Sequence, residues 1–210
     1  MSKIQLMIAD SCKLTQDLWT FILNSDPRFQ VVCTCSETDD IKQLASEKNP
    51  DVIMMNLYSP LYKKLATISD IRKHCPQSFV LGISSNPLAG YAEKMLQSGA
   101  RGYVTRNSSL EEILHAIVEL AKGNKYIGED IRDSLYVNLL SNNQTDSVIS
   151  VREMQVLELI KAGLSSKEIA AELSISPRTV ELHRYHILKK LNLKNTVSLV
   201  NYVNTSPLFC

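Results

Sequence analysis

The stretch that decides the fold of the C-terminal part is GLSSKEIAAELSISPRTVELHRYHILKKL, residues 163–191. Ser165 precedes Glu168 by three residues, which is the spacing of a capping box at the start of a helix. Ser176 followed by Pro177 marks a second helix start, because Ser caps free amide groups and Pro loses no hydrogen bond at the first helical position. The stretch therefore predicts two helices joined by a tight turn.

The second helix has two different faces when its residues are placed at about 100° intervals. Val180, Ile187 and Leu191 fall together and form the expected buried face. For an isolated helix, an ordinary amphipathic helix with a mixed polar face would be the simpler interpretation. The preceding helix, the tight turn and the Ser-Pro start favour a helix–turn–helix that binds DNA, since cations bind phosphates and other side chains meet base edges. The outward residues are Arg178, Leu182, Tyr185 and Lys189.

Residues 149–195, ISVREMQVLELIKAGLSSKEIAAELSISPRTVELHRYHILKKLNLKN, resemble the DNA-binding domain of the LuxR family, as found in NarL- and FixJ-like response regulators. The resemblance implies a small all-α domain of four helices and double-stranded DNA as the partner. Glu181 is the least expected base reader, because its negative charge repels phosphate. It can nevertheless accept a hydrogen bond from cytosine N4, or it can serve to exclude wrong sequences. The implied base readers are Glu181, Leu182 and Tyr185, and the implied phosphate-binding residues are Arg178, Thr179, Lys189 and Lys190.

The family usually dimerises through its last helix, which corresponds here to residues 196–203. The helix has more apolar surface than its own domain needs, and this surface comes from Val197, Leu199, Val200 and Val203. The candidate contacts of a homodimer are Val197, Val200 and Val203. Two-fold symmetry implies inverted half-sites about one helical turn, ~10 bp, apart.

Residues 3–121 alternate between strand and helix signals. The segment PDVIMMNL, residues 50–57, is almost continuously apolar, as expected of a strand buried on both faces. Ser108 and Glu111 have capping-box spacing at the start of the last helix. Five strand–helix units predict a doubly wound α/β fold with a five-stranded parallel sheet and a site at the carboxyl ends of the strands. The expected strands are 3–9, 29–34, 50–57, 79–83 and 101–104, and the expected helices are 12–24, 38–48, 62–74, 87–97 and 108–121.

The chain therefore divides into an α/β domain at 1–123, a helical linker at 124–147 and a helix–turn–helix domain at 148–210. Within the linker, residues 129–140 have helical spacing, and the polar run SNNQTDS follows at 141–147. No segment approaches the roughly 18 apolar residues that a membrane helix requires, so we expect a cytoplasmic protein without membrane contact.

The α/β domain resembles the receiver domain of two-component signalling. In that family, two acids after the first strand hold Mg²⁺, and an Asp at the end of the third strand accepts phosphate. A Thr or Ser after the fourth strand and a Lys after the fifth contact the phosphoryl group. The resemblance rests on IADS at 8–11, PDVIMMNLYSP at 50–60, GISS at 82–85 and GARGYVTRNSSLEEILHAI at 99–117.

At the corresponding positions this chain has Asp10 with Ser11, then Asn56, Ser84 and Arg106. A neutral amide is a poor nucleophile and cannot form an acyl phosphate. Replacing a carboxylate by Ser11 leaves one charged ligand for Mg²⁺, which prefers several oxygens. Arg106 keeps the charge of Lys but is longer and planar. The site is therefore interpreted as a degenerate phosphorylation site.

Two interpretations of the degenerate site stay open at this stage. In one, hydrogen bonds fill a dead site, with Asp10 pairing with Arg106, and the domain is retained for dimerisation. In the other, the domain responds to a small ligand or a protein partner. Tyr103 stands where receivers often have an aromatic residue that moves with the switch, although it can equally be a fixed core residue.

Charge and motif content help to decide between a DNA-binding protein and an enzyme. The formal net charge is only +1, but residues 150–210 hold eight Lys and Arg against five Asp and Glu, which suits a polyanionic partner. There is no phosphate-binding Gly-rich loop and no nucleophile–His or metal-ligand pattern, so neither an enzyme nor a cofactor is expected. A DNA-binding transcription regulator with a receiver independent of phosphorylation is the leading hypothesis. A protein-interaction adaptor, or a ligand-responsive regulator, is the alternative.

Overall fold

The computed structural model describes residues 2–36, 41–57, 61–84, 89–133 and 149–205. These residues form two compact units, which are described separately. None of the described helices is long and apolar enough to cross a membrane.

The first unit is built on a parallel sheet with the strand order β2-β1-β3-β4-β5-β6. The described part of the chain thus has six strands where the sequence predicted five. The additional strand, β6, pairs in parallel with β5 and lies inside the segment expected to be a helical linker. Two residues are too few to show an alternating pattern, which is why the strand was missed. The strands are β1 (Ile4–Ala9), β2 (Phe29–Cys35), β3 (Val52–Leu57), β4 (Phe79–Ser84), β5 (Gly102–Thr105) and β6 (Tyr126–Ile127).

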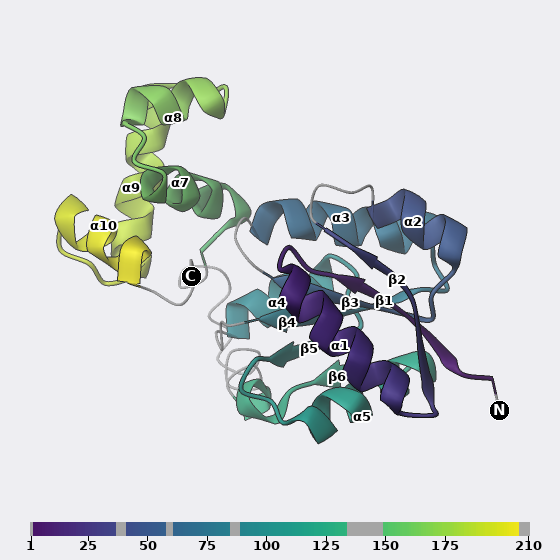
Figure 1. Ribbon diagram of the computed structural model, residues 1–210. Helices are drawn as coiled ribbons and strands as arrows, with labels where there is room; N and C mark the ends of the chain where they lie inside the picture. The colour runs from purple at the N-terminus through teal and green to yellow at the C-terminus, as the bar shows by residue number, and fades with distance from the viewer. Residues whose placement is uncertain (1, 37–40, 58–60, 85–88, 134–148, 206–210) are drawn as a thin grey trace. The chain divides into compact units, whose positions relative to one another are not determined.

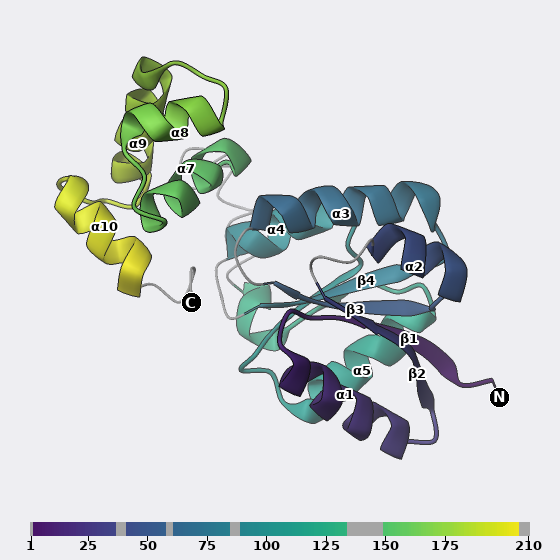
Figure 2. The same ribbon diagram turned by 45° about the horizontal axis from the view of Figure 1, so that its top comes forward.

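Helices cover both faces of this sheet, as a doubly wound fold requires. Helices α1 and α5 lie on one face, and α2, α3 and α4 lie on the other (Figures 1 and 2). After β6, residues 129–133 are helical, while the rest of the helix expected at 129–140 and the run 141–147 fall outside the described residues. The helices are α1 (Lys13–Ser25), α2 (Ile41–Lys48), α3 (Leu61–His74), α4 (Ala89–Gln97) and α5 (Leu110–Ala121).

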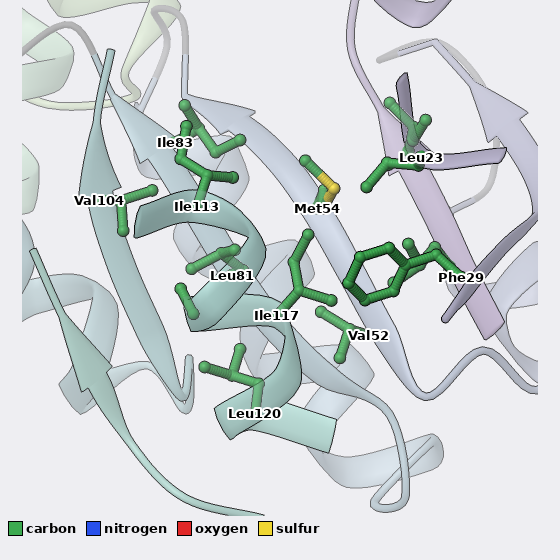
Figure 3. Close-up of a cluster of buried hydrophobic side chains, with 13 residues drawn as sticks. Leu23, Phe29, Val52, Met54, Leu81, Ile83, Val104, Ile113, Ile117 and Leu120 are labelled. Atoms are coloured by element: carbon green, nitrogen blue, oxygen red, sulfur yellow. The ribbon is translucent and has the colours of Figure 1, made fainter. Parts of the chain in front are cut away.

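One face of the sheet packs on α1 and α5 to form a core of buried side chains (Figure 3). Ile113, Ile117 and Leu120 of α5 lie over the central strands, and the Phe29 ring lies next to Val52. The start of α5 differs by one residue from the prediction: the hydroxyl of Ser109, rather than that of Ser108, accepts the backbone N–H of Glu112. Ser108 and Ser109 each have a glutamate three residues later, so the sequence does not decide which of the two serines caps the helix.

The second unit contains the described helices α7 (Val151–Lys161), α8 (Ser166–Glu172), α9 (Pro177–Lys190) and α10 (Thr196–Thr205). Both predicted capping boxes are present, one from Ser150 and one from Ser165. Ser176 caps α9 through the backbone N–H of Thr179, and Pro177 occupies the first turn, as predicted. In the turn between α8 and α9, Ser174 has a φ of 53°, in the left-handed region that makes a tight reversal possible.

The inner face of α9 is the one that the helical wheel predicted, except that Leu191, the residue that follows the helix, is only partly buried. Val180 and Ile187 are completely buried, as are Ile169 of α8 and Leu199 and Val203 of α10. Burying this apolar side fixes the rotation of α9 about its own axis. The opposite side of α9 is consequently turned outward.

Candidate DNA-binding face and receiver site

The outward side of α9 carries two large exposed side chains. Leu182 is 53% exposed and Tyr185 is 62% exposed. The Tyr185 ring lies against the ring of His186, with the centroids 5.8 Å apart. Leu182 and Tyr185 are thus available for contact outside the domain, at the positions expected for base readers.

The first turn and the C-terminal end of α9 carry the expected phosphate-binding residues. Arg178 and Lys189 are exposed. The Thr179 hydroxyl lies 2.8 Å from the capping hydroxyl of Ser176 and is part of the helix start. Free amides and the helix dipole make such a start favourable for anions. A phosphate-binding role for Arg178, Thr179 and Lys189 is compatible with these positions.

Lys190 lies in a different environment from that expected of a phosphate contact. Its ammonium group is 2.8 Å from Oε2 of Glu153, and the two side chains are only 16% and 4% exposed. Burial alone raises the pKa of the Glu153 carboxyl, but hydrogen bonds from Lys190 and Ser150 outweigh this and hold the pKa below its ordinary value. This ion pair joins the end of α9 to the start of α7. Lys190 therefore positions α9 within the domain.

Glu181 also has partners that sequence reasoning did not find. The Ser166 hydroxyl, at the start of α8, donates to Oε1 of Glu181 over 2.5 Å. Nη1 of Arg184 donates to the same hydroxyl over 3.0 Å, and Nε of Arg184 lies 3.9 Å from Oε2 of Glu181. The three residues form a closed triangle across the helix–turn–helix. Ser166 and Glu181 are 15 positions apart, so no local spacing rule connects them.

The three valines proposed for a dimer contact do not share one surface of α10. Val197 and Val200 are exposed, whereas Val203 is completely buried beside the domain's own core residue Leu199. An apolar residue recurring at helical spacing marks a face, but it does not say which partner covers that face. An exposed surface for a partner would therefore include Val197 and Val200 only.

The carboxyl ends of the central strands bring the predicted receiver residues together. Nδ2 of Asn56 donates to Oδ2 of Asp10 over 2.7 Å, and Nη2 of Arg106 donates to Oδ1 of Asn56 over 3.3 Å. Asp10 and Asn56 are both buried. The expected pairing of Asp10 with Arg106 is thus relayed through Asn56, which stands between them and is hydrogen-bonded to both. The amide joins the ends of β1, β3 and β5.

The donor set at this site does not fit the magnesium ion that the receiver family implies. Asp10 provides a single carboxylate, and its two oxygens accept hydrogen bonds from Asn56 and from the backbone N–H of Cys12. Ser11, at the second acidic position of the family, is exposed and neutral. Within the described ranges, no group of three His, Cys, Asp or Glu side chains could hold a metal. Mg²⁺ prefers several oxygen ligands in octahedral array.

Tyr103 connects the receiver site to the segment that follows the sheet. Its side chain is completely buried. Burial raises the pKa of the Tyr103 hydroxyl well above its ordinary value, a hydrogen bond with Ser84 opposes the rise, and the charge of Asp130 adds to it. Thr105, on the same strand, donates a hydrogen bond to the Asp130 carboxylate. Tyr103 is thus a core residue whose hydroxyl is linked to the site through Ser84.

A receiver-type α/β unit followed by a helix–turn–helix unit defines the class of two-domain DNA-binding response regulators. The family of bacterial regulatory proteins of the luxR type matches residues 147–203, and the response regulator receiver domain matches residues 6–118. The oxygen regulatory protein NreC of Staphylococcus epidermidis is 32% identical over 209 residues, which cover 95% of this chain and 96% of that protein. The chain therefore belongs to the LuxR-type, NarL-like response regulators.

A second relative agrees with this assignment, and solved structures share the fold. NreC of Staphylococcus aureus is 32% identical over 208 residues, covering 95% of this chain and 96% of that protein. RcsB from Salmonella enterica serovar Typhimurium, bound to promoter rprA in the presence of phosphomimetic BeF3-, has a TM-score of 0.70 at 21% identity and covers 97% of this chain and 100% of that one. The response regulator ChrA of a heme-sensing two-component system has a TM-score of 0.53 at 22% identity, covering 99% and 100%. At these identities the two structures show the fold alone.

Proposed function

We propose that this protein is a sequence-specific transcription regulator, acting in the cytoplasm, whose receiver domain is not controlled by aspartyl phosphorylation. The observation that carries the proposal is the hydrogen-bond chain from Arg106 to Asn56 to Asp10. In receivers the cation after the fifth strand contacts the phosphoryl group, and here Arg106 contacts the Asn56 amide oxygen. An amide at this position cannot form an acyl phosphate. The two hydrogen bonds engage both the amide nitrogen and the amide oxygen of Asn56.

The outward side of α9 is the proposed DNA-reading surface. Leu182 and Tyr185 are exposed on it, and Arg178 and Lys189 flank them with positive charge. Direct readout needs side chains that reach base edges in the major groove, while cations hold the phosphates on either side. These two kinds of contact respond differently to mutation, and this difference provides the test.

Tyr185→Ala should change the preferred sequence at particular base pairs, by roughly 1–3 kcal/mol each, in a binding-site selection with the full chain. Lys189→Ala should weaken binding to all sequences alike and reduce the salt slope of log Kd by about one unit. Lys13→Ala removes the same charge from an exposed side chain at the start of α1, in the receiver unit. It is the matched control and should leave the slope unchanged. A selection in which Tyr185→Ala and Glu181→Ala both return the wild-type motif would remove this face of α9 from the proposed role.

The proposed DNA-bound form is a homodimer. Val197 and Val200 provide an exposed apolar patch on α10, and RcsB has been solved as two dimers bound to two parallel DNAs. A two-fold pair of α9 helices implies inverted half-sites about one helical turn, ~10 bp, apart. A wild-type protein that binds operator DNA strictly as a monomer in light scattering would contradict this part of the proposal.

A further inference from the structure

We infer that Ser166 determines DNA sequence preference without touching a base, by fixing the Glu181 carboxylate as an acceptor for a cytosine amino group. The inference rests on the proposed DNA-reading role of α9. It adds a residue from α8 to that role and gives Glu181 a stated base partner.

The geometry holds Glu181 in one place although its side chain is 62% exposed. The Ser166 hydroxyl donates its single proton to Oε1 of Glu181 and accepts a hydrogen bond from Nη1 of Arg184. A glutamate on the surface of an isolated helix samples many rotamers, and ordering them on binding costs entropy. A carboxylate that is already held by a residue of another helix loses less freedom when it meets a base.

The carboxylate keeps acceptor capacity that the triangle does not use. An ionised carboxyl group has about four acceptor positions. Oε1 of Glu181 uses one of them for Ser166, and Oε2 lies 3.9 Å from Nε of Arg184, which is longer than a hydrogen bond. Oε2 can therefore accept a hydrogen bond from DNA. Ser166, whose proton is already donated, has none to offer to a phosphate.

Charge explains why the triangle includes an arginine. A carboxylate near the DNA backbone is repelled by phosphates, and Arg184, whose side chain is only 15% exposed, places a positive charge beside it. In the major groove, cytosine presents its N4 donor alone, and adenine presents its N6 donor beside the N7 acceptor. Guanine O6 and N7 and thymine O4 are acceptors and would repel Glu181. The triangle therefore favours cytosine and disfavours the acceptor-bearing bases at the same position.

The test is a binding-site selection with the full-length wild type, Ser166→Ala, Ser166→Thr, Glu181→Ala, Tyr185→Ala and the double variant Ser166→Ala/Glu181→Ala. The ratio of affinities for two duplexes that differ only at the cytosine position is then measured for each protein. Ser166→Ala should lower this ratio by about three- to tenfold, a part of the roughly 5- to 150-fold that a complete base contact contributes. Ser166→Thr keeps the hydroxyl and should keep the ratio. In the Glu181→Ala background, Ser166→Ala should change nothing further.

Each other outcome overturns the inference in a recognisable way. If Glu181→Ala changes the motif and Ser166→Ala does not, Ser166 does not position Glu181. If Ser166→Ala lowers the melting temperature and weakens binding to both duplexes equally, the triangle only braces α8 against α9. If Glu181→Ala returns the wild-type motif while Tyr185→Ala alters it, Glu181 is not a base reader, although α9 keeps its proposed function. If neither variant alters the motif, the proposed DNA-reading face fails as well.

Discussion

Restoring the acid of the receiver family, by Asn56→Asp, should destabilise this protein. The change removes the amide that donates to Asp10 over 2.7 Å and places a second carboxylate beside the buried first one. Losing a hydrogen bond to a charged group costs about 2 kcal/mol. Two like charges about 4 Å apart repel by about 4 kcal/mol at an effective dielectric constant near 20, and attraction to Arg106 offsets a similar amount. The net loss of unfolding free energy should be about 2 kcal/mol at pH 7.

The chain contains a built-in probe for this measurement. Trp19, the single tryptophan, packs against the core of the receiver unit, so its fluorescence during urea unfolding reports on that unit. Asn107→Asp makes the same chemical change at an exposed position and should alter the unfolding free energy by less than about 0.5 kcal/mol.

Two results would refute this reasoning. One is an Asn56→Asp variant that is as stable as the wild type at pH 7 without added cations. The other is full recovery of its stability by millimolar Mg²⁺, since that would mean that Asp10 and the new carboxylate suffice to hold the ion. We expect Asn56→Asp alone to restore little phosphorylation, because Ser11 and Arg106 are unchanged.

Two further predictions concern the DNA-binding unit. Glu153→Gln leaves the Lys190 ammonium without its partner and should lower the stability of this unit by about 3 kcal/mol in calorimetry of the full chain. Because the pKa of Glu153 lies below its ordinary value, the ion pair stabilises the unit above about pH 4.5, and this stabilisation is lost as the pH falls through the folded-state pKa. If Glu153→Gln lowered the stability equally at every pH, the prediction would be contradicted. Val197→Asp should reduce the mass of the operator complex in light scattering without changing the melting temperature. Val203→Asp should instead unfold the unit, because Val203 is buried. Equal effects of the two changes would argue against an exposed dimer contact.

Local signals in the sequence predicted local structure well. The caps at Ser150 and Ser165 were predicted from a Glu three positions later and the cap at Ser176 from the Pro that follows it, and each is present. The buried side of α9, with Val180 and Ile187, follows from helical periodicity alone. The meeting of Asp10 and Asn56 was also predictable, because parallel strands end at the same edge of the sheet.

Contacts between residues distant in the chain were not predictable from spacing. Lys190 pairs with Glu153 across 37 positions, so its place in the sequence predicts a phosphate contact and does not reveal its support of α9. The partnership of Glu181 with Ser166 crosses the turn between two helices. For Val203, periodicity gave the helix face but not the partner, which is the core of its own domain.

The central claim is that this regulator binds DNA without aspartyl phosphorylation of its receiver. The direct test treats the full chain with acetyl phosphate and Mg²⁺, measures its intact mass, and then measures its affinity for the selected operator by fluorescence anisotropy. Because Asn56 cannot form an acyl phosphate and is hydrogen-bonded to Asp10 and Arg106, the mass and the Kd should both be unchanged. A phosphorylated species that survives removal of the donor and binds the operator more tightly would contradict the account.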